Sequence, residues 1–142
     1  MKYKLIERSS PDLGTLAAID LSVLGVSREK HHKYLLNDRA MKGLLFYKVN
    51  DCVGYAYVAS TGHVGPLALR SSDDMEEALN TSLNIAAEGQ SDQVSAFLPG
   101  SNEAALRVAA EHRMRITFPM VLVSNREFGD WSRYLARNPG FM

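Results

Sequence analysis

The sequence predicts an α/β domain with a mixed, twisted sheet and helices on both faces. A helical stripe of leucines follows the first strand-like run, three strand-like runs come next, and helices then alternate with strands. The predicted order is β-α-α-β-β-β-α-β-α-β. An antiparallel meander followed by alternating strands and helices is typical of a mixed sheet. The 142 residues suffice for one ordinary domain and not for two, so we take residues 1–142 as a single domain.

The N-terminal region predicts one strand and two helices. Alternating residues over 2–9 predict the strand. Ser10-Pro11-Asp12 is typical of a helix start, with Ser at the N-cap, Pro at the first helical position and an acid in the first turn. Gly25 ends this helix, and Ser27 opens a second, shorter one over residues 28–38. The apolar stripe of the first helix consists of Leu13, Leu16, Ala17, Leu21 and Leu24.

The next region predicts a meander of three strands. Residues 41–49 and 52–60 flank Asn50-Asp51, a pattern that predicts a β-hairpin. A third strand begins at His63 and extends over residues 63–70, although it contains Gly65-Pro66. Because proline has no N–H to donate, it interrupts the hydrogen-bond ladder at this point. We therefore expect a break or bulge in this strand.

Alternation of helices and strands continues to the C-terminal region. Asp73-Asp74-Met75-Glu76 predicts a capping box that opens a helix. A short strand over 93–99, a helix over 102–114 and a strand over 115–125 follow, while residues 126–142 give no clear pattern. The crossover between the third meander strand and residues 93–99 should be right-handed and parallel.

Composition and charge limit the classes of function. Hydrophobic residues make up 46% and charged residues 23%, as in soluble globular proteins. Residues 1–50 have a net charge of +4, residues 51–100 of −6 and residues 101–142 of +2, so no basic stripe for nucleic acid is present. No apolar run approaches the length of a membrane span, and the start MKYKLIERSS lacks the apolar core that a signal peptide has. Since Cys52 is also the only cysteine, we expect a cytoplasmic protein without membrane contact.

The element order resembles that of the GNAT acyltransferase superfamily, over residues 2 to about 125. Two local features carry the resemblance: the strand with Gly65-Pro66, and the loop Pro99-Gly100-Ser101-Asn102 that opens the next helix. The phrase GYAYVASTGHVGPLAL is similar to a GNAT subgroup with an "IGP"-type fourth strand. The resemblance implies that the fourth strand parts from the fifth, and that the pantetheine arm of acyl-CoA pairs with the exposed edge.

The resemblance also implies a function and a site. It implies an acyl-CoA-dependent N-acyltransferase, with acetyl-CoA as donor and an amine of a small molecule or peptide as acceptor, acting by direct transfer. Backbone N–H groups near Leu67, Ala68 and Leu69 would polarise the thioester carbonyl. Arg70, Ser71 and Ser72 would form the pyrophosphate turn, and Asn102 would open the following helix beside the donor.

Two side chains are candidates for acid–base work and acceptor binding. His63 begins the strand that faces the reaction centre in the family, and its reference pKa suits a general base acting directly or through water. A polar residue at a strand end is the alternative interpretation. Asp20 lies on the apolar stripe of the first helix, where a lone carboxylate is costly. It either pairs with a buried partner or binds a cationic amine.

The sequence also departs from the family pattern. The turn between Leu69 and Asp74 has no glycine. Its two carboxylates at a helix N-terminus would repel a pyrophosphate unless Arg70 and the hydroxyls of Ser71 and Ser72 compensate. The position seven residues after Asn102, where many family members have a tyrosine acid, is Ala109. These departures favour the alternative that the chain is a degenerate GNAT-like module, which binds a ligand or protein partner without catalysis.

No pattern predicts a metal site. His31 and His32 are adjacent on a predicted helix and so point apart, and zinc spacing is absent. Tyr55 and Tyr57 share one strand face, which indicates packing or an acceptor groove. The aromatic pair Trp131 and Tyr134 indicates a buried edge or a contact in a homodimer.

Overall fold

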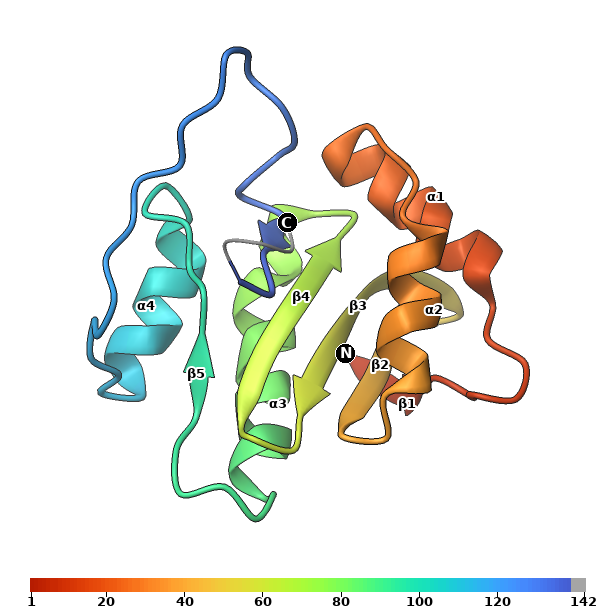
Figure 1. The fold of residues 1–142 in the computed structure, drawn as a ribbon, viewed down its shortest axis with the longest axis horizontal. Helices are drawn as coiled ribbons and strands as arrows, with labels where there is room; N and C mark the ends of the chain where they lie inside the picture. Colours follow the sequence, from red (N-terminus) through yellow and green to blue (C-terminus); the bar gives the residue numbers. More distant parts are fainter. Residues whose placement is uncertain (139–142) are drawn as a thin grey trace.

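The computed structural model describes residues 1–138, which form a six-stranded mixed sheet with four α-helices (Figure 1). The predicted α/β class is confirmed. The strands are β1 (Lys2–Leu5), β2 (Met41–Lys48), β3 (Asp51–Ala59), β4 (His63–Leu69), β5 (Ser95–Ala96) and β6 (Tyr134–Leu135). The helices are α1 (Leu13–Leu24), α2 (Glu29–Asn37), α3 (Met75–Ala87) and α4 (Glu103–Glu111), with a 3-10 turn η1 (Ser72–Asp74) before α3.

The strands follow the order β1-β2-β3-β4-β5, and β6 pairs with β4. Strands β1 to β4 form the predicted antiparallel meander, and β5 runs parallel to β4 as the crossover requires. The β3–β4 register shifts between Ala56 and Val58, opposite Gly65-Pro66. The expected irregularity in this strand is therefore present.

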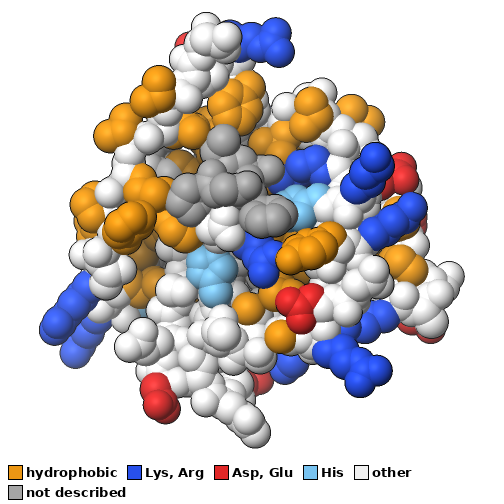
Figure 2. Space-filling view, viewed as in Figure 1, with side chains coloured by type: hydrophobic (Ala, Val, Ile, Leu, Met, Phe, Trp, Pro, Cys, Tyr) orange, Lys and Arg blue, Asp and Glu red, His pale blue; other side chains and the backbone are white. Residues whose placement is uncertain are grey.

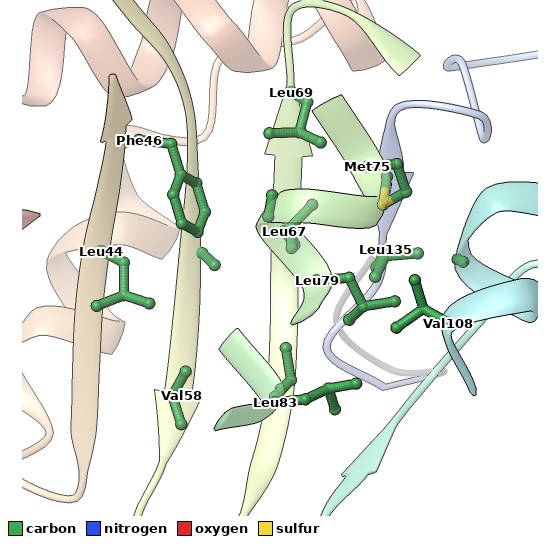
Figure 3. Packing of buried hydrophobic residues seen from close by; sticks show 14 of the residues in the cluster. Leu44, Phe46, Val58, Leu67, Leu69, Met75, Leu79, Leu83, Val108 and Leu135 are labelled. Carbon is green, nitrogen blue, oxygen red and sulfur yellow. The ribbon is translucent and has the colours of Figure 1, made fainter. Parts of the chain in front are cut away.

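Helices cover both faces of the sheet, each over its own apolar cluster. Successive strand residues point to opposite faces, so Leu44 and Phe46 of β2 pack with α3 and α4, while Leu45 between them faces α1 and α2. Figure 3 shows the first cluster, in which Leu67 and Leu69 of β4 lie beside Met75 and Leu79 of α3. Among residues 1–138, no helix is long and apolar enough to cross a membrane.

Three of the predicted helix starts differ in detail. Asp12 rather than Ser10 caps α1, because its side chain accepts a hydrogen bond from Thr15 N, and Gly25 ends α1 with a φ of 75°. Arg28 precedes α2 without a side-chain cap, so the Ser27 cap was wrong. The Asp73–Glu76 capping box was also wrong, because η1 inserts before α3 and the Ser71 side chain accepts from Asp73 N.

The predicted strand over 115–125 is absent. This segment forms no regular structure, and Ile116, Val121 and Val123 are each more than four-fifths exposed. In Figure 2, hydrophobic side chains gather along the edge where Figure 1 draws this segment. Strand-like composition did not suffice here. Pro119 has no N–H to donate to a neighbouring strand. In addition, β5 spans only two of the seven residues predicted for it, so it offers only a short edge for pairing. The sheet gains β6 from the region after residue 126 instead.

Candidate functional site

The two halves of β4 pair with different strands. His63 and Val64 pair with Ser95 and Ala96 of β5, and the strands then part. Beyond Gly65-Pro66, Leu67 and Ala68 pair antiparallel with β6, and Leu69 N donates to Arg133 O at 2.9 Å. The β4 edge that the resemblance assigns to pantetheine is thus occupied by the C-terminal part of the chain. We call residues 130–137 the strap.

Gly65 lies where the strap approaches β4 most closely. Its φ is 141°, a conformation that L side chains rarely adopt, and the Gly65–Pro66 peptide bond is cis. A Cβ added at Gly65 would lie 2.7 Å from Ala136 O. Glycine is therefore required here for two reasons: the positive φ angle, and the close approach of the Ala136 carbonyl of the strap.

His63 holds the C-terminal end of the strap. Its Nε2 donates to Arg137 O at 2.5 Å, and its Nδ1 lies 2.9 Å from Ser95 Oγ. Since a carbonyl can only accept, the proton lies on Nε2, and the hydroxyl donates to Nδ1. Burial lowers the pKa of His63, only partly opposed by the hydrogen bond to Arg137. A neutral imidazole at pH 7 is chemically suited to accept a proton, but both its nitrogens are engaged.

Asn102 holds the other end of the strap. Its Oδ1 accepts from Ala105 N, which caps α4 as predicted. Its Nδ2 donates to Trp131 O at 3.0 Å and to Ser132 O at 3.1 Å, and the residue is 2% exposed. The side chain thus connects the start of α4 to the strap.

Arg133 fastens the middle of the strap, and sequence reasoning did not single it out. Its Nη1 donates to Arg70 O and its Nη2 to Ser22 O, both at 3.0 Å, and its Nε donates to Asp130 Oδ2 at 2.7 Å. The main chain adds a bond from Asp130 N to Val23 O. The strap is therefore joined to α1 and to the end of β4. The sequence could have indicated only the Asp130–Arg133 ion pair, from the spacing of three residues between the two charges.

Asp20 lies at the centre of a buried polar network. Arg28 donates to both carboxylate oxygens, from Nη2 at 3.0 Å and from Nε at 3.2 Å, and His32 Nε2 donates to Oδ2 at 2.9 Å. The Tyr55 hydroxyl donates to Oδ1 at 2.5 Å. Asp20 is fully buried, so the pairing alternative describes its environment, and no oxygen is open to bind an amine.

Charge balance keeps this network ionised. Burial by itself raises the pKa of Asp20, but hydrogen bonds from His32 and Arg28 and the charge of Arg28 hold it below its ordinary value. Burial likewise lowers the pKa of Arg28, and the neighbouring Tyr55 and Asp20 more than reverse this. The carboxylate and guanidinium are therefore both charged at neutral pH.

The strap extends this network. Arg28 Nη1 donates to the Tyr134 hydroxyl at 2.7 Å, and the guanidinium lies 5.0 Å from the Tyr134 ring centre. Tyr134 is fully buried with Tyr55 and Tyr57, which do share one face and pack there. Trp131 packs edge-on against Tyr134, which accounts for the predicted buried edge.

One surface cavity borders the strap at Ser132, and a second lies beside Phe128, which packs against Trp131 of the strap. The first, of about 380 Å³, lies between η1 and the start of α4, and its lining includes the predicted residues Ser72 and Asn102. Three carboxylates line it, Asp73, Glu76 and Glu103, against one arginine that is already paired with Glu76. Asp74 is turned away and pairs with Lys48, and Ser71 caps η1. The predicted repulsion of a pyrophosphate therefore persists at this cavity.

The second cavity has the opposite charge. It measures about 320 Å³ and lies between the end of α1, the α1–α2 loop and residues 124–128. Arg28 and Arg126 line it together with Ser124 and Asn125. No carboxylate lines this cavity, so it presents the charge of Arg126 beside the Arg28 guanidinium, whose own charge is balanced by Asp20. Within residues 1–138, no three His, Cys, Asp or Glu side chains group as a metal site.

The sheet order, the parting of β4 from β5 and the helices on both faces give the chain the GNAT fold. Solved N-acetyltransferases are similar to it. A ribosomal-protein-alanine N-acetyltransferase from Brucella melitensis biovar Abortus 2308 has a TM-score of 0.61 and 15% identity, over 87% of this chain and 99% of that one.

Two aminoglycoside-related structures extend the comparison. AAC(6')-Iy, in complex with the bisubstrate analogue CoA-S-monomethyl-acetylneamine, has a TM-score of 0.64 and 8% identity, over 88% of this chain and 97% of that one. The aminoglycoside acetyltransferase meta-AAC0020 from an uncultured soil metagenomic sample, in complex with sisomicin, has a TM-score of 0.59 and 14% identity. This match covers 89% of this chain and 95% of that one. No protein-family model and no curated protein matches the sequence.

Proposed function

We propose that the domain is an acyl-CoA-dependent N-acyltransferase, which transfers an acetyl group from acetyl-CoA to an amine of a small molecule or peptide. The observation that carries the proposal is the opening after the Val64–Ala96 pair. The predicted residues of β4, together with His63 and Asn102, border this opening. Similarity to a fold neighbour with a bound CoA bisubstrate analogue supports the choice of donor.

The proposed chemistry is direct attack of the amine on the thioester carbonyl, with the CoA thiolate leaving. Leu69 N–H points into the opening, where it now donates to Arg133 O, and strand alternation puts Leu67 N–H on the same side. Two such donors would stabilise the oxyanion of the tetrahedral intermediate, at about 3 kcal/mol each in well-studied acyl transfer. Ala109 supplies no acid, so water would protonate the thiolate.

The proposed roles of His63 and Asp20 follow from their contacts. His63 would take the amine proton on Nδ1, directly or through the Ser95 hydroxyl that now occupies it. Asp20 would act through Arg28, which it holds at the wall of the positive cavity. An acceptor that carries an anionic group beside its amine would suit two arginines better than a polycation.

A second candidate function is a GNAT-fold module that binds a ligand or protein partner without catalysis. The specific observation in its favour is the occupied edge of β4, combined with the three carboxylates of the 380 Å³ cavity. Homodimer formation stays a prediction. The exposed apolar residues of segment 116–123 would be a suitable contact surface for it. A cytoplasmic location likewise stays a prediction.

Thermal unfolding against acetyl-CoA tests the proposal, with ATP and 3′-dephospho-CoA as controls. Ligand at 100 times its Kd adds about 2.7 kcal/mol, or a few degrees of Tm. A shift with acetyl-CoA alone, followed by acetylated product in an amine screen that His63→Ala abolishes, is the expected result. A shift without product from any amine would favour the non-catalytic module. Donor binding would be refuted if millimolar acetyl-CoA gave no shift in the wild type and none in Arg133→Ala, which loses the bonds that hold the strap to Ser22 and Arg70.

A further inference from the structure

Residues of β4 and the start of α4 that the sequence predicted for the site contact the strap. Leu67 and Ala68 pair with it, Leu69 donates to it, and His63 and Asn102 hold its two ends. From this convergence we propose that the strap is an intramolecular competitor of acyl-CoA, which must leave the β4 edge before the pantetheine arm can pair there. This inference rests on the proposed function, since it names the regulation of the same donor site.

Competition follows from the hydrogen bonds of the edge. Pantetheine is an extended chain with two amides, and the strap is an extended peptide, so both bind by adding N–H and C=O groups to an open strand. Leu69 N–H already donates to Arg133 O at 2.9 Å. One N–H cannot serve the strap and a ligand in good geometry at once. Occupation of this edge is therefore exclusive.

Side chains make the strap a well-held competitor. Leu135 is fully buried in the cluster under α3, and Tyr134 is fully buried in the cluster under α1 and α2. The Tyr134 hydroxyl also accepts from Arg28. When the competent state is a small fraction of the population, the apparent Kd rises by the inverse of that fraction. We therefore expect weak acetyl-CoA binding by the wild type and tighter binding once the strap is loosened.

Arg133 is the residue through which the strap can be loosened with least damage to the core. Its side chain is 23% exposed and donates to Ser22 O and Arg70 O, outside both apolar clusters. Arg133→Ala removes these bonds and leaves Tyr134 and Leu135 intact. The matched control is Arg115→Ala, which removes the same charge from an exposed residue outside the strap. Loss of a positive charge alone would weaken binding of an anionic donor, opposite to the expected effect.

The first measurement is calorimetric titration of acetyl-CoA into the wild type and both variants. We expect the Kd of Arg133→Ala to be about tenfold lower than that of the wild type, and Arg115→Ala to bind no more tightly than the wild type. If acetyl-CoA binds but the Kd of Arg133→Ala equals that of the wild type, the competition is overturned. The donor site would still stand, because the ligand binds. Absence of binding in all three proteins would refute the proposed function as well, so the two failures are distinguishable.

Trp131 provides a second readout that needs no variant. It is the only tryptophan, lies in the strap, and packs against Phe128 and Tyr134 with its Nε1 donating to Phe128 O. Saturating acetyl-CoA should shift its emission to longer wavelength as the strap leaves the core. Hydrogen exchange at Tyr134 and Leu135 should speed up in the same titration. Binding without either change would show that the donor and the strap occupy separate places, which contradicts the proposal.

Discussion

The two ends of β4 differ in what completes the sheet beside them. The first end pairs with β5, which arrives through the α3 crossover, and only two residues of each strand take part. The second end pairs with the strap, which comes from the C-terminal part of the chain. Gly65-Pro66 thus marks the point where one partner strand replaces the other. An interruption in a strand sequence can therefore indicate a change of partner as well as an empty edge.

The second end is also the better buried of the two. Leu67, Ala68, Tyr134 and Leu135 are all fully buried, whereas Ser95 is exposed and Ala96 half-buried. Full burial of one leucine side chain contributes about 1.5–3 kcal/mol. The strap is therefore part of the core as well as an occupant of the predicted site, and its removal must have a cost in stability.

The largest expected loss of stability comes from Asp20→Ala, which removes the carboxylate at the centre of the buried network that contacts Tyr134. Breaking a buried pair leaves the Arg28 charge uncompensated and typically costs about 3–5 kcal/mol. Asp12→Ala is the control, since Asp12 caps the same helix at the surface and its loss should cost about 1 kcal/mol. Urea unfolding measures both. Equal losses would mean that Asp20 adds no more than a surface cap.

A smaller effect is expected from Gly65→Ala, at the boundary between the two ends. The new Cβ would meet Ala136 O at 2.7 Å in a backbone conformation that disfavours it, so we expect a loss of about 1–3 kcal/mol. Gly100→Ala is the matched control, because a Cβ there meets nothing within 4 Å. Thermal unfolding of the two variants gives the difference. If both alanines are tolerated alike, the strap does not approach Gly65 as described.

Sequence reasoning was most accurate where the fold depends on local pattern. Alternation and turn residues located β2, β3 and β4, because hairpin strands are neighbours in both sequence and space. Asn102 caps α4, at the helix opening where the family resemblance placed it. Asp20 stood out since a carboxylate within an apolar stripe needs a partner, although the pattern could not name Arg28 and Tyr55.

The C-terminal part was mispredicted for the opposite reason. Segment 115–125 has the stronger strand composition, yet the sheet uses Tyr134–Leu135, whose two side chains fit the two clusters on opposite faces. That fit depends on contacts with residues more than 60 positions earlier, such as Leu67. Local propensity is a weak guide when tertiary packing decides which of two segments enters a sheet.

The smallest expected effect is a pH dependence at the first end of β4. Burial holds the pKa of folded His63 below its unfolded value of about 6.5, so in the window below pH 6.5 the unfolded chain binds more protons. The contribution of His63 to stability is therefore complete above that pH and is lost as the pH falls through the lowered pKa. His63→Gln retains a donor for Arg137 O and an acceptor for Ser95 without titrating. Between pH 7 and 5 its Tm should fall less than that of the wild type, by about 1–3 °C. A variant with the wild-type slope would mean that His63 is solvated, and that the strap does not close over this end of the strand.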